Sequence, residues 1–342
     1  MTTTSNSALV SVIIPTYNRA QLIGEMISSL VAQTYRPLEI IVSDDGSTDN
    51  TRDLVDELFK RSRSETLTCE YVINAKANAD YARNRGFEHS HGDYVIFLDS
   101  DDVASPTMIQ RMVAALREAD ADFCVCDNEH FIHFPGDLGL VVPFSERGHR
   151  PEDHLVSLAM NVSTLFRRSA LEKIGPWDER LTAWDDVEFT FRALLCLRGT
   201  WIPEPSYLVR VRAHRVVNTG RGLEIRREIN EQGFQSMVLA RHAMRQFAQD
   251  RGCLSVRLRR ALGQSMVALA RMGRRRGFER GVRQALGSGL ALLPLPLRVV
   301  NKAHWGLMQF LGVNFLKGWR VRLSPSERRR RAQGKLRPRS ER

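Results

Sequence analysis

Apolar runs alternate with amphipathic segments along the first hundred residues of the chain. The apolar runs, which predict buried strands, lie at 9–15, 38–42, 70–73 and 94–98. Apolar residues at three- and four-residue intervals predict helices near 20–33, around 54–59 and at 78–89. This alternation is typical of βαβ units on a parallel sheet. We therefore predict an α/β fold in which right-handed crossovers bring the loops after the strands to one edge.

The first apolar run ends in a proline, and the fourth is followed by three carboxylates. Pro15 is expected to end the first strand, because proline cannot donate a ladder hydrogen bond. The fourth run leads directly into Asp99, Ser100, Asp101 and Asp102. Ligands of such sheets bind beyond the carboxyl ends of the strands. Two carboxylates that flank one residue can face a single Mg²⁺ or Mn²⁺ ion. The alternative is an acidic turn that only closes the strand.

The pattern continues less regularly downstream. The expected elements are a helix at 106–118, a strand at 120–127, a returning strand at 161–168, a short helix from 170 and an amphipathic helix from 186. The segment 128–153 has no clear periodicity, and we assign no element to it.

Charge divides the chain into two regions. The first 250 residues contain 27 Lys and Arg against 36 Asp and Glu, whereas residues 251–342 contain 23 against 3. With 43% hydrophobic residues the chain can build a sizeable core, which excludes a disordered protein. An acidic body followed by a basic tail indicates two regions with different partners.

The cysteines and the N-terminus bear on location. The five cysteines are odd in number and irregularly spaced, which favours reduced thiols over disulfides or zinc ligands. Residues 1–8 are polar, are expected to be disordered, and lack the basic and apolar regions of a signal peptide. No window of about 18 uncharged apolar residues predicts a membrane-spanning helix. We expect a cytoplasmic protein.

Four ordered motifs resemble those of the family 2 glycosyltransferases. They are VIIPTYN at 12–18, IVSDDGSTD at 41–49, ARNRG at 82–86 and FLDSDD at 97–102. The resemblance implies a GT-A fold, a Rossmann-like mixed sheet flanked by helices, for a domain over residues 9–220. It also implies a nucleotide-sugar donor. We recognise nothing beyond this domain.

The resemblance implies roles for the residues of the donor side. The residues implied to bind the nucleotide sugar are Pro15, Thr16, Tyr17, Asp44, Arg83, Asp99 and Ser100. The residues from the first two motifs would hold the base and ribose, and those from the fourth would lie near the ribose and donor sugar. Arg83 would reach the base or a phosphate, or it is simply a surface residue of its helix.

The resemblance also implies a divalent metal ion, Mg²⁺ or Mn²⁺. Asp101 would bind this ion, which would offset the charge that develops on the leaving diphosphate. His214 lies where many members of the family have a late histidine that completes the metal or phosphate site. A polar loop residue is the alternative for His214.

Asp186 is the expected general base. The family usually has Gly-Glu-Asp at this point, whereas this chain has Trp184, Asp185 and Asp186. One base suffices for a single in-line displacement by the acceptor hydroxyl, which agrees with the inverting reaction of the family. A carboxylate at a helix start is stabilised as an anion by the helix dipole. Trp184 would stack on an acceptor sugar or pack in the core.

The basic C-terminal part predicts helices and then disorder. We assign residues 221–322 to a helical region and residues 323–342 to a disordered tail. The uncharged stretches 284–297 and 303–316, flanked by basic residues, resemble interfacial helices on the anionic inner leaflet of the cytoplasmic membrane. The alternative is a helical appendage packed on the catalytic domain. We expect no nucleic-acid partner, because no recognised nucleic-acid-binding module is present.

The sequence thus predicts a metal-dependent inverting glycosyltransferase. Its donor would be a nucleotide-diphosphate sugar, and its acceptor a polysaccharide or a lipid-linked oligosaccharide. Two alternatives are a nucleotidyltransferase on a similar fold and a non-catalytic sugar- or lipid-binding scaffold. The lack of a Gly-rich, basic phosphate loop after the first strand speaks against the former. The intact acidic residues speak against the latter.

Overall fold

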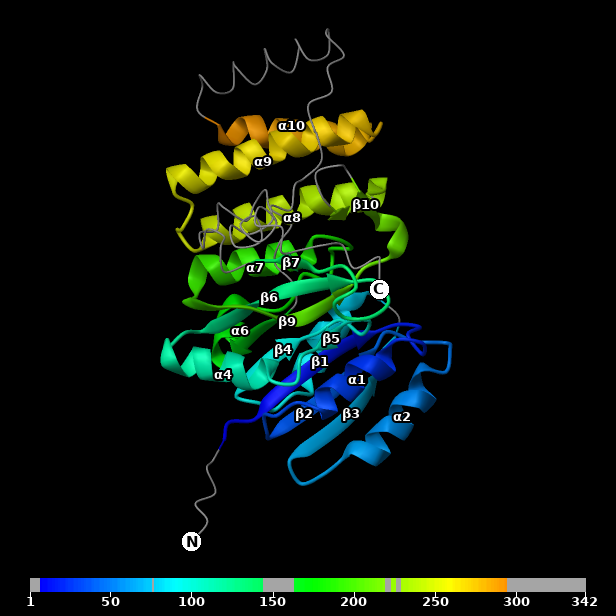
Figure 1. Ribbon diagram of the computed structural model, residues 1–342. Helices are drawn as coiled ribbons and strands as arrows, with labels where there is room; N and C mark the ends of the chain where they lie inside the picture. The colour runs from blue at the N-terminus through cyan, green and yellow to red at the C-terminus, as the bar shows by residue number, and fades with distance from the viewer. Residues whose placement is uncertain (1–6, 76, 144–162, 219–222, 226–228, 294–342) are drawn as a thin grey trace, which may run out of the picture.

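A nine-stranded mixed sheet organises the computed structural model, which describes residues 7–75, 77–143, 163–218, 223–225 and 229–293. The strands run in the order β3-β2-β1-β4-β8-β6-β9-β5, and β7 pairs with β6 (Figure 1). A separate two-stranded sheet joins β10 to β11. The α/β fold class predicted from the sequence is therefore confirmed.

The first four predicted strands form the parallel half of the sheet. They are β1 (Val10–Thr16), β2 (Leu38–Asp44), β3 (Leu67–Ile73) and β4 (Tyr94–Phe97). Every residue of β1, β2 and β4 is buried, as the continuous apolar runs require. The prediction that Pro15 ends β1 was wrong. Pro15 lies opposite Ser43 and Thr16 opposite Asp44, because a proline keeps its carbonyl acceptor even though it lacks the N–H.

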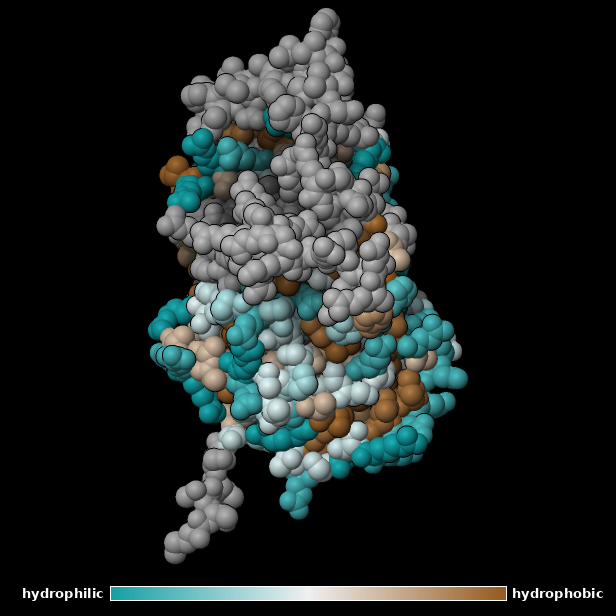
Figure 2. Space-filling view, in the orientation of Figure 1, coloured by the Kyte–Doolittle hydropathy of each residue, from teal (hydrophilic) through white to brown (hydrophobic). Residues whose placement is uncertain are grey.

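Helices cover both faces of this parallel half. They are α1 (Ile23–Val31), α2 (Thr51–Ser62) and α3 (Ala79–Glu88). Apolar side chains of α1 and α2 pack with Val12 and Ile14 of β1, whereas Phe87 of α3 packs in the cluster that contains Ile13. A side chain at Gly86 would come within 2.5 Å of Ile13, so α3 lies very close to the sheet. Figure 2 shows hydrophilic residues on the outer face of α2 and hydrophobic residues in the seam beside α1.

The second half of the sheet is antiparallel at its junction with β4. It contains β5 (Val103–Ala104), β6 (Phe123–Phe131), β7 (Leu140–Val142), β8 (Thr164–Arg167) and β9 (Gly199–Arg210). Its helices are α4 (Met108–Glu118), α6 (Arg168–Ile174) and α7 (Asp185–Cys196). β8 runs antiparallel to both β4 and β6, as expected for a returning strand.

Two boundaries differ from the sequence prediction in this half. β6 begins at Phe123 and continues to Phe131, into the segment to which no element was assigned. The second part of β6 pairs with β7 and β9. Its polar and apolar residues do not alternate, so sequence periodicity could not reveal this part of the strand. Part of that segment and the first residues of the predicted returning strand, at 144–162, lie outside the described residues.

The chain then enters a mainly helical region. A short turn, η1 (Ala213–Arg215), precedes β10 (Val216–Asn218) and β11 (Leu223–Ile225). The helical assignment from residue 221 was wrong for the three residues of β11, which pair with β10. The helices are α8 (Glu231–Asp250), α9 (Val256–Arg275) and α10 (Glu279–Leu292).

This helical region packs on α7, beside the nine-stranded sheet. One buried apolar cluster joins Met237 of α8, Leu262 of α9 and Ala285 of α10 to Val187 and Phe191 of α7. Figure 1 shows α8, α9 and α10 stacked beyond α7 on one side of the sheet. The described part of 284–297 therefore packs as an appendage. Residues 303–316 and 323–342 lie outside the described residues, and among those that are described no helix has the length and apolarity to cross a membrane.

Candidate active site

The ends of β1, β2 and β4 lie side by side at one edge of the sheet. Thr16 lies opposite Asp44, and the Asp45 N–H donates to the Thr16 carbonyl oxygen at 2.8 Å. β4 pairs with the other side of β1, and the Leu98 N–H just beyond it donates to the Ile13 carbonyl at 3.0 Å. The register therefore gathers the loops that carry the first, second and fourth motifs.

Asp44 is fixed by hydrogen bonds on both carboxylate oxygens. Its Oδ1 accepts from the Ser47 N–H at 3.0 Å and from the Ser47 hydroxyl at 2.6 Å, and its Oδ2 accepts from the Tyr71 hydroxyl at 2.7 Å. Burial, and then the hydrogen bond to Asp44, raise the pKa of Tyr71, so it remains a neutral donor. Asp44 is thus a buried and oriented acceptor at the end of β2.

The loop after β1 combines buried and exposed groups. Pro15 and Thr16 are buried, and the Thr16 hydroxyl has no hydrogen-bond partner within the described part of the chain. Tyr17 exposes 36% of its surface. Asn18 adopts a positive φ of 50°, and its side-chain oxygen accepts from the Thr48 N–H at 2.8 Å. The first two motifs are therefore tied into one wall that presents Tyr17 to solvent.

Arg83 lies at the centre of a carboxylate network. Its Nη1 donates to Asp80 Oδ1 at 2.6 Å and to Asp185 Oδ2 at 2.8 Å, and its Nη2 donates to Asp99 Oδ1 at 3.2 Å. The guanidinium also lies 4.6 Å from the ring centroid of Trp177. The structure thus places Arg83 on protein carboxylates in the interior, and only 5% of the residue is exposed. The surface alternative is excluded.

The charged groups in this network shift one another's pKa values. Burial alone would lower the pKa of Arg83, but the carboxylates outweigh it and raise the pKa, so the guanidinium stays charged. Burial, and then the negative charge of Asp185, raise the pKa of Asp80 to about 8, against the opposing effect of Arg83. Desolvation raises the pKa of Asp99, with Arg83 opposing and Asp101 and Asp185 adding to the rise.

The three carboxylates after β4 face different surroundings. The side chains of Asp99 and Asp101 are 42% and 35% exposed, and Asp101 forms an ion pair with Arg19 at 3.5 Å. Asp102 is buried and accepts from the Arg210 N–H at 2.7 Å. Burial, and then the charges of Asp99 and Asp101, raise the pKa of Asp102 well above its usual value. Only Asp99 and Asp101 are therefore available to an ion or a substrate.

Arg210 and Tyr207 bond the backbone of residues 99–102, the acidic turn after β4. The Arg210 Nε donates to the Asp101 carbonyl oxygen at 2.9 Å, and the Tyr207 hydroxyl accepts from the Asp99 N–H at 3.0 Å. Ser100 is buried between the two acids. Sequence reasoning did not single out Arg19, Arg210 or Tyr207. A basic residue directly after the first motif was a visible signal for Arg19, but no local signal marked the other two.

The donor set suits a metal ion that is bound together with a substrate. The described residues contain no group of three or more His, Cys, Asp or Glu side chains placed to hold an ion. His214 lies in the turn η1, and its side chain is outside the described atoms. Mg²⁺ is commonly held by one or two carboxylates plus substrate phosphates. Asp99 and Asp101 fit that arrangement, in which a substrate diphosphate and water would supply the remaining ligands.

The candidate base lies at the start of α7. Asp185 is the first residue of this helix, and Asp186 Oδ1 accepts from the Val187 N–H at 2.8 Å. Through Arg83, Asp185 is tied to Asp99, so the acidic turn and the first turn of α7 belong to one site. Both carboxylates lie in the first turn, where the helix dipole stabilises anions. Sequence reasoning named Asp185 only as a departure from the family pattern and missed its contact with Arg83.

Trp184 packs in the core instead of facing a ligand. It is 8% exposed, belongs to the apolar cluster of α7 and α8, and has the Arg241 guanidinium 4.1 Å from its ring centroid. Its φ of 65° is in the left-handed region, which favours glycine. Of the two interpretations of Trp184, the structure supports packing.

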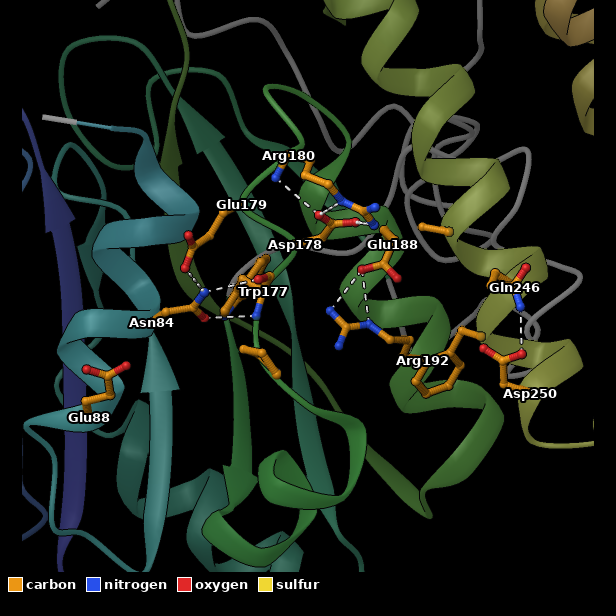
Figure 3. Close-up of a pocket in the computed structure, with 13 residues that line it drawn as sticks. Asn84, Glu88, Trp177, Asp178, Glu179, Arg180, Glu188, Arg192, Gln246 and Asp250 are labelled. Atoms are coloured by element: carbon orange, nitrogen blue, oxygen red, sulfur yellow. Dashed lines mark hydrogen bonds and ion pairs between the residues drawn. The ribbon is translucent and has the colours of Figure 1, made fainter.

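A separate cavity of about 640 Å³ lies between α3, residues 176–180, α7 and α8 (Figure 3). Asn84 Nδ2 donates to Glu179 Oε1 at 2.8 Å, and Arg192 Nε donates to Glu188 Oε2 at 3.0 Å. The ring of Trp177 is stacked on Phe189 at 3.9 Å. Neither Asp99 nor Asp101 lines this cavity, so it is distinct from the sheet edge where the strands end.

Comparison with known proteins gives a consistent result. The family described as glycosyl transferase family 2 matches residues 11–175. An uncharacterized glycosyltransferase of Nostoc is 31% identical over 49% of this chain and 54% of its own length. The Escherichia coli enzyme named UDP-Glc:alpha-D-GlcNAc-diphosphoundecaprenol beta-1,3-glucosyltransferase is 38% identical over 34% of this chain and 44% of its own. The chain thus spans about half the length of these relatives.

Two solved structures share the fold at low identity. Residues 1–349 of S. aureus TarS in complex with UDP-GlcNAc match at a TM-score of 0.53 and 18% identity, over 87% of this chain and 91% of that chain. The mannosyltransferase of Pyrobaculum calidifontis in complex with GDP-Man and Mn²⁺ matches at 0.54 and 20%, over 90% and 82%. Both matches extend well beyond the family region.

Proposed function

We propose that the chain, whose residues 11–175 match glycosyltransferase family 2 and which has the GT-A fold, is a metal-dependent, inverting enzyme of that family. It transfers a sugar from a nucleotide-diphosphate sugar to a polysaccharide or lipid-linked oligosaccharide. One observation carries the proposal: Arg83 bonds both Asp99 and Asp185. This contact joins Asp99 of the donor side to Asp185, the residue next to the candidate base, which supports a single site.

The nucleotide is assigned to the ends of β1 and β2. Asp44 is an oriented acceptor for a base or ribose donor, and Tyr17 offers a partly exposed ring against which a base can pack. The Thr16 hydroxyl, unpartnered within the described residues, is a further polar group there. The two structural neighbours were solved with UDP-GlcNAc and with GDP-Man, which supports a nucleotide sugar without naming it.

The diphosphate and the metal ion are assigned to Asp99 and Asp101. A bound Mg²⁺ or Mn²⁺ ion would supply a Lewis acid that offsets the charge of the leaving group. The neighbouring mannosyltransferase contains Mn²⁺, which supports this assignment. Arg19, which pairs with Asp101 at 3.5 Å, is close enough to exchange that carboxylate for a phosphate. His214 remains a proposed further ligand.

Asp186 is assigned as the general base. It removes the proton from the acceptor hydroxyl, whose oxygen attacks the anomeric carbon while the bond to the diphosphate oxygen breaks. The anomeric configuration inverts because one displacement occurs. Asp185 is the weaker candidate, since its carboxylate already accepts a hydrogen bond from Arg83 at 2.8 Å and is turned toward that side chain.

The acceptor is assigned by analogy with relatives and by charge. The related E. coli enzyme is named for an acceptor linked to diphosphoundecaprenol, which supports a lipid-linked acceptor here. The excess of Lys and Arg beyond residue 250 would draw the enzyme to an anionic inner leaflet. Cytoplasmic residence with peripheral membrane contact is therefore part of the proposal, and nucleic acid is not an expected partner.

A donor screen tests the proposal. The full chain is incubated with Mg²⁺ or Mn²⁺ and a panel of nucleotide sugars, and melting temperature and nucleoside diphosphate release are recorded. A ligand that binds the folded state raises its stability, so one donor should raise the melting temperature only with metal present. Asp101→Ala should lose that shift, and Asp186→Asn should keep it but lose turnover.

The products separate the alternatives. Release of the sugar 1-phosphate instead of nucleoside diphosphate would indicate a nucleotidyltransferase, because transfer of the nucleotidyl group breaks the bond between the two phosphates. Binding without turnover by the wild-type chain with any acceptor would favour a sugar-binding scaffold. An absence of binding by every nucleotide sugar and diphosphate, with either metal, would refute the transferase assignment.

A further inference from the structure

Helix α8 contacts the backbone that leads into the Asp185–Asp186 pair. The Ser236 hydroxyl oxygen accepts from the Thr182 N–H at 2.9 Å and from the Ala183 N–H at 3.1 Å, and it donates to the Ala183 carbonyl oxygen at 2.8 Å. A serine hydroxyl has one donor and two acceptor lone pairs. Ser236 therefore uses its one donor and both of its acceptor lone pairs on the backbone of Thr182 and Ala183.

The next residue is held by α8 as well. Trp184 is the residue before α7 and has a φ of 65°, a conformation that is sterically unfavourable for a residue with a Cβ. Its ring is buried in the cluster that contains Met237 and Met244 of α8. The Arg241 guanidinium lies 4.1 Å from the ring centroid and is itself kept in place by Ser265 and by the Met237 carbonyl. The backbone and the ring of this short segment thus both depend on α8.

The direction in which α7 begins depends on this segment. Asp185 follows Trp184 directly and is the first residue of α7. A shift in the start of α7 would therefore move the Asp185 carboxylate away from Arg83. Ser236 is 5% exposed and lies outside the region 11–175 that matches the family. Asp185 and Asp186 also lie beyond that region, and α8 sets the position of the segment that leads into them.

We propose that Ser236 is a positioning residue for the Asp185–Asp186 pair. Its hydroxyl fixes the backbone of residues 182–183, so that Asp185 stays on Arg83 and Asp186 is oriented toward the acceptor. The catalytic part of this inference rests on the proposed function, because it takes Asp186 as the base. The structural part, that α8 fixes the first turn of α7 through one hydroxyl, does not.

The test compares three substitutions in the full chain. Ser236→Ala removes the hydroxyl, and Ser236→Thr restores it. Ser288→Ala is the matched control, since Ser288 is a half-buried serine of α10 that contacts His242 of α8 at 3.3 Å and not the acid-bearing segment. If Ser236→Ala does not fold, Ser236→Cys takes its place, because it keeps the size of the side chain but has a weak donor and acceptor.

The expected result is a change in kcat without a change in donor binding. A misplacement of about 1 Å can lower a rate by about 100-fold, so Ser236→Ala should lower kcat by about 10- to 100-fold. The donor KM and the melting shift with nucleoside diphosphate should change by less than about twofold. Ser236→Thr should recover most of kcat, and Ser288→Ala should match the wild type. A Ser236→Ala enzyme with a lower melting temperature but full kcat would overturn the inference.

Amide hydrogen exchange separates this inference from the proposed function. In Ser236→Ala the amides of Thr182 and Ala183 lose their acceptor, so exchange across 182–186 should become faster, while exchange in α3 stays unchanged. Unchanged exchange across 182–186 would overturn the inference even in an active enzyme. If wild-type protein transfers no sugar, the proposed function fails, and the exchange result alone decides whether Ser236 fixes the start of α7.

Discussion

The donor side and the base side of the site are held in different ways. On the donor side, Asp44 bonds Ser47 three residues later and Tyr71 on the adjacent strand of the sheet. On the base side, Asp185 bonds Arg83 across 102 residues, and the segment before it bonds Ser236 across 53 and 54 residues. The donor side is therefore largely a property of the sheet and its turns. The base side exists only when α3, α7 and α8 are docked together.

This difference has a consequence for substitutions. A change on the donor side removes one of several local contacts and should affect mainly donor affinity. A change on the base side removes a contact between distant parts of the chain, so it should alter catalysis or the stability of the whole domain.

Asp186→Asn should give the largest effect. General-base catalysis typically contributes about 10²- to 10⁴-fold, and an amide cannot accept the proton of the acceptor hydroxyl. We expect kcat to fall by that range while the melting shift with donor and metal persists. Initial rates of nucleoside diphosphate release measure it. Asp250→Asn, at a carboxylate on the cavity of Figure 3, is the control and should keep kcat. Wild-type rates in Asp186→Asn would move the base role to Asp185.

Arg83→Met should strongly destabilise the fold. Removing one partner of a buried ion pair typically costs about 3–5 kcal/mol, because the remaining charge is left uncompensated. Here Asp80, Asp99 and Asp185 would all lose a donor. The free energy of unfolding in urea measures the change. Arg85→Met on the same helix removes an exposed pair with Glu88 and should change stability by less than about 0.5 kcal/mol. Equal effects would show that the network does not hold the two sides together.

Asp80 should make stability depend on pH. Its pKa rises from 3.8 in the unfolded chain to about 8 in the folded protein, because it is buried and lies near Asp185. A raised pKa favours the protonated folded state, so this contribution is fully present below pH 3.8 and is lost as the pH rises toward 8. Between pH 5 and 7 the loss should be about 3 kcal/mol.

The control for that pH dependence is Asp80→Asn, which cannot ionise. Its unfolding free energy should vary less between pH 5 and 7 than that of the wild type, with urea titrations at each pH as the measurement. Parallel curves for the two proteins would mean that Asp80 is ionised in the folded state throughout this range, with Arg83 outweighing burial.

The same contrast explains what the sequence could predict. The strands and the positions of Asp44, Asp99 and Asp101 follow from apolar runs that end in polar turns, since register alone brings those ends together. Asp102 could not be distinguished from its neighbours, because only tertiary contacts with Arg210 and Tyr207 turn it inward. The hydrophobic pattern of the sequence predicts which residues follow a strand, but it does not predict which way each side chain points.

The contacts of the base side left no local signal. Arg83 lies on a predicted helix, yet nothing near it in sequence shows that its partners include Asp185. Trp184 occupies a position where the resembling family usually has glycine, and its positive φ explains that preference. The reason that tryptophan is accommodated lies in Arg241 and the cluster of α8, which begins almost fifty residues later. Packing of this kind cannot be read from periodicity.

Tyr71→Phe should give the smallest effect and therefore sharpens the comparison. It removes one of the hydrogen bonds to Asp44 but leaves both from Ser47, so the carboxylate keeps much of its orientation. A single hydrogen bond typically contributes about 1 kcal/mol, so the donor KM should rise by at most about fivefold, with kcat unchanged. Steady-state kinetics with varied donor measure both constants. A fall in kcat as large as that expected for Ser236→Ala would mean that the donor side also positions the reacting groups, and that the two sides of the site are coupled.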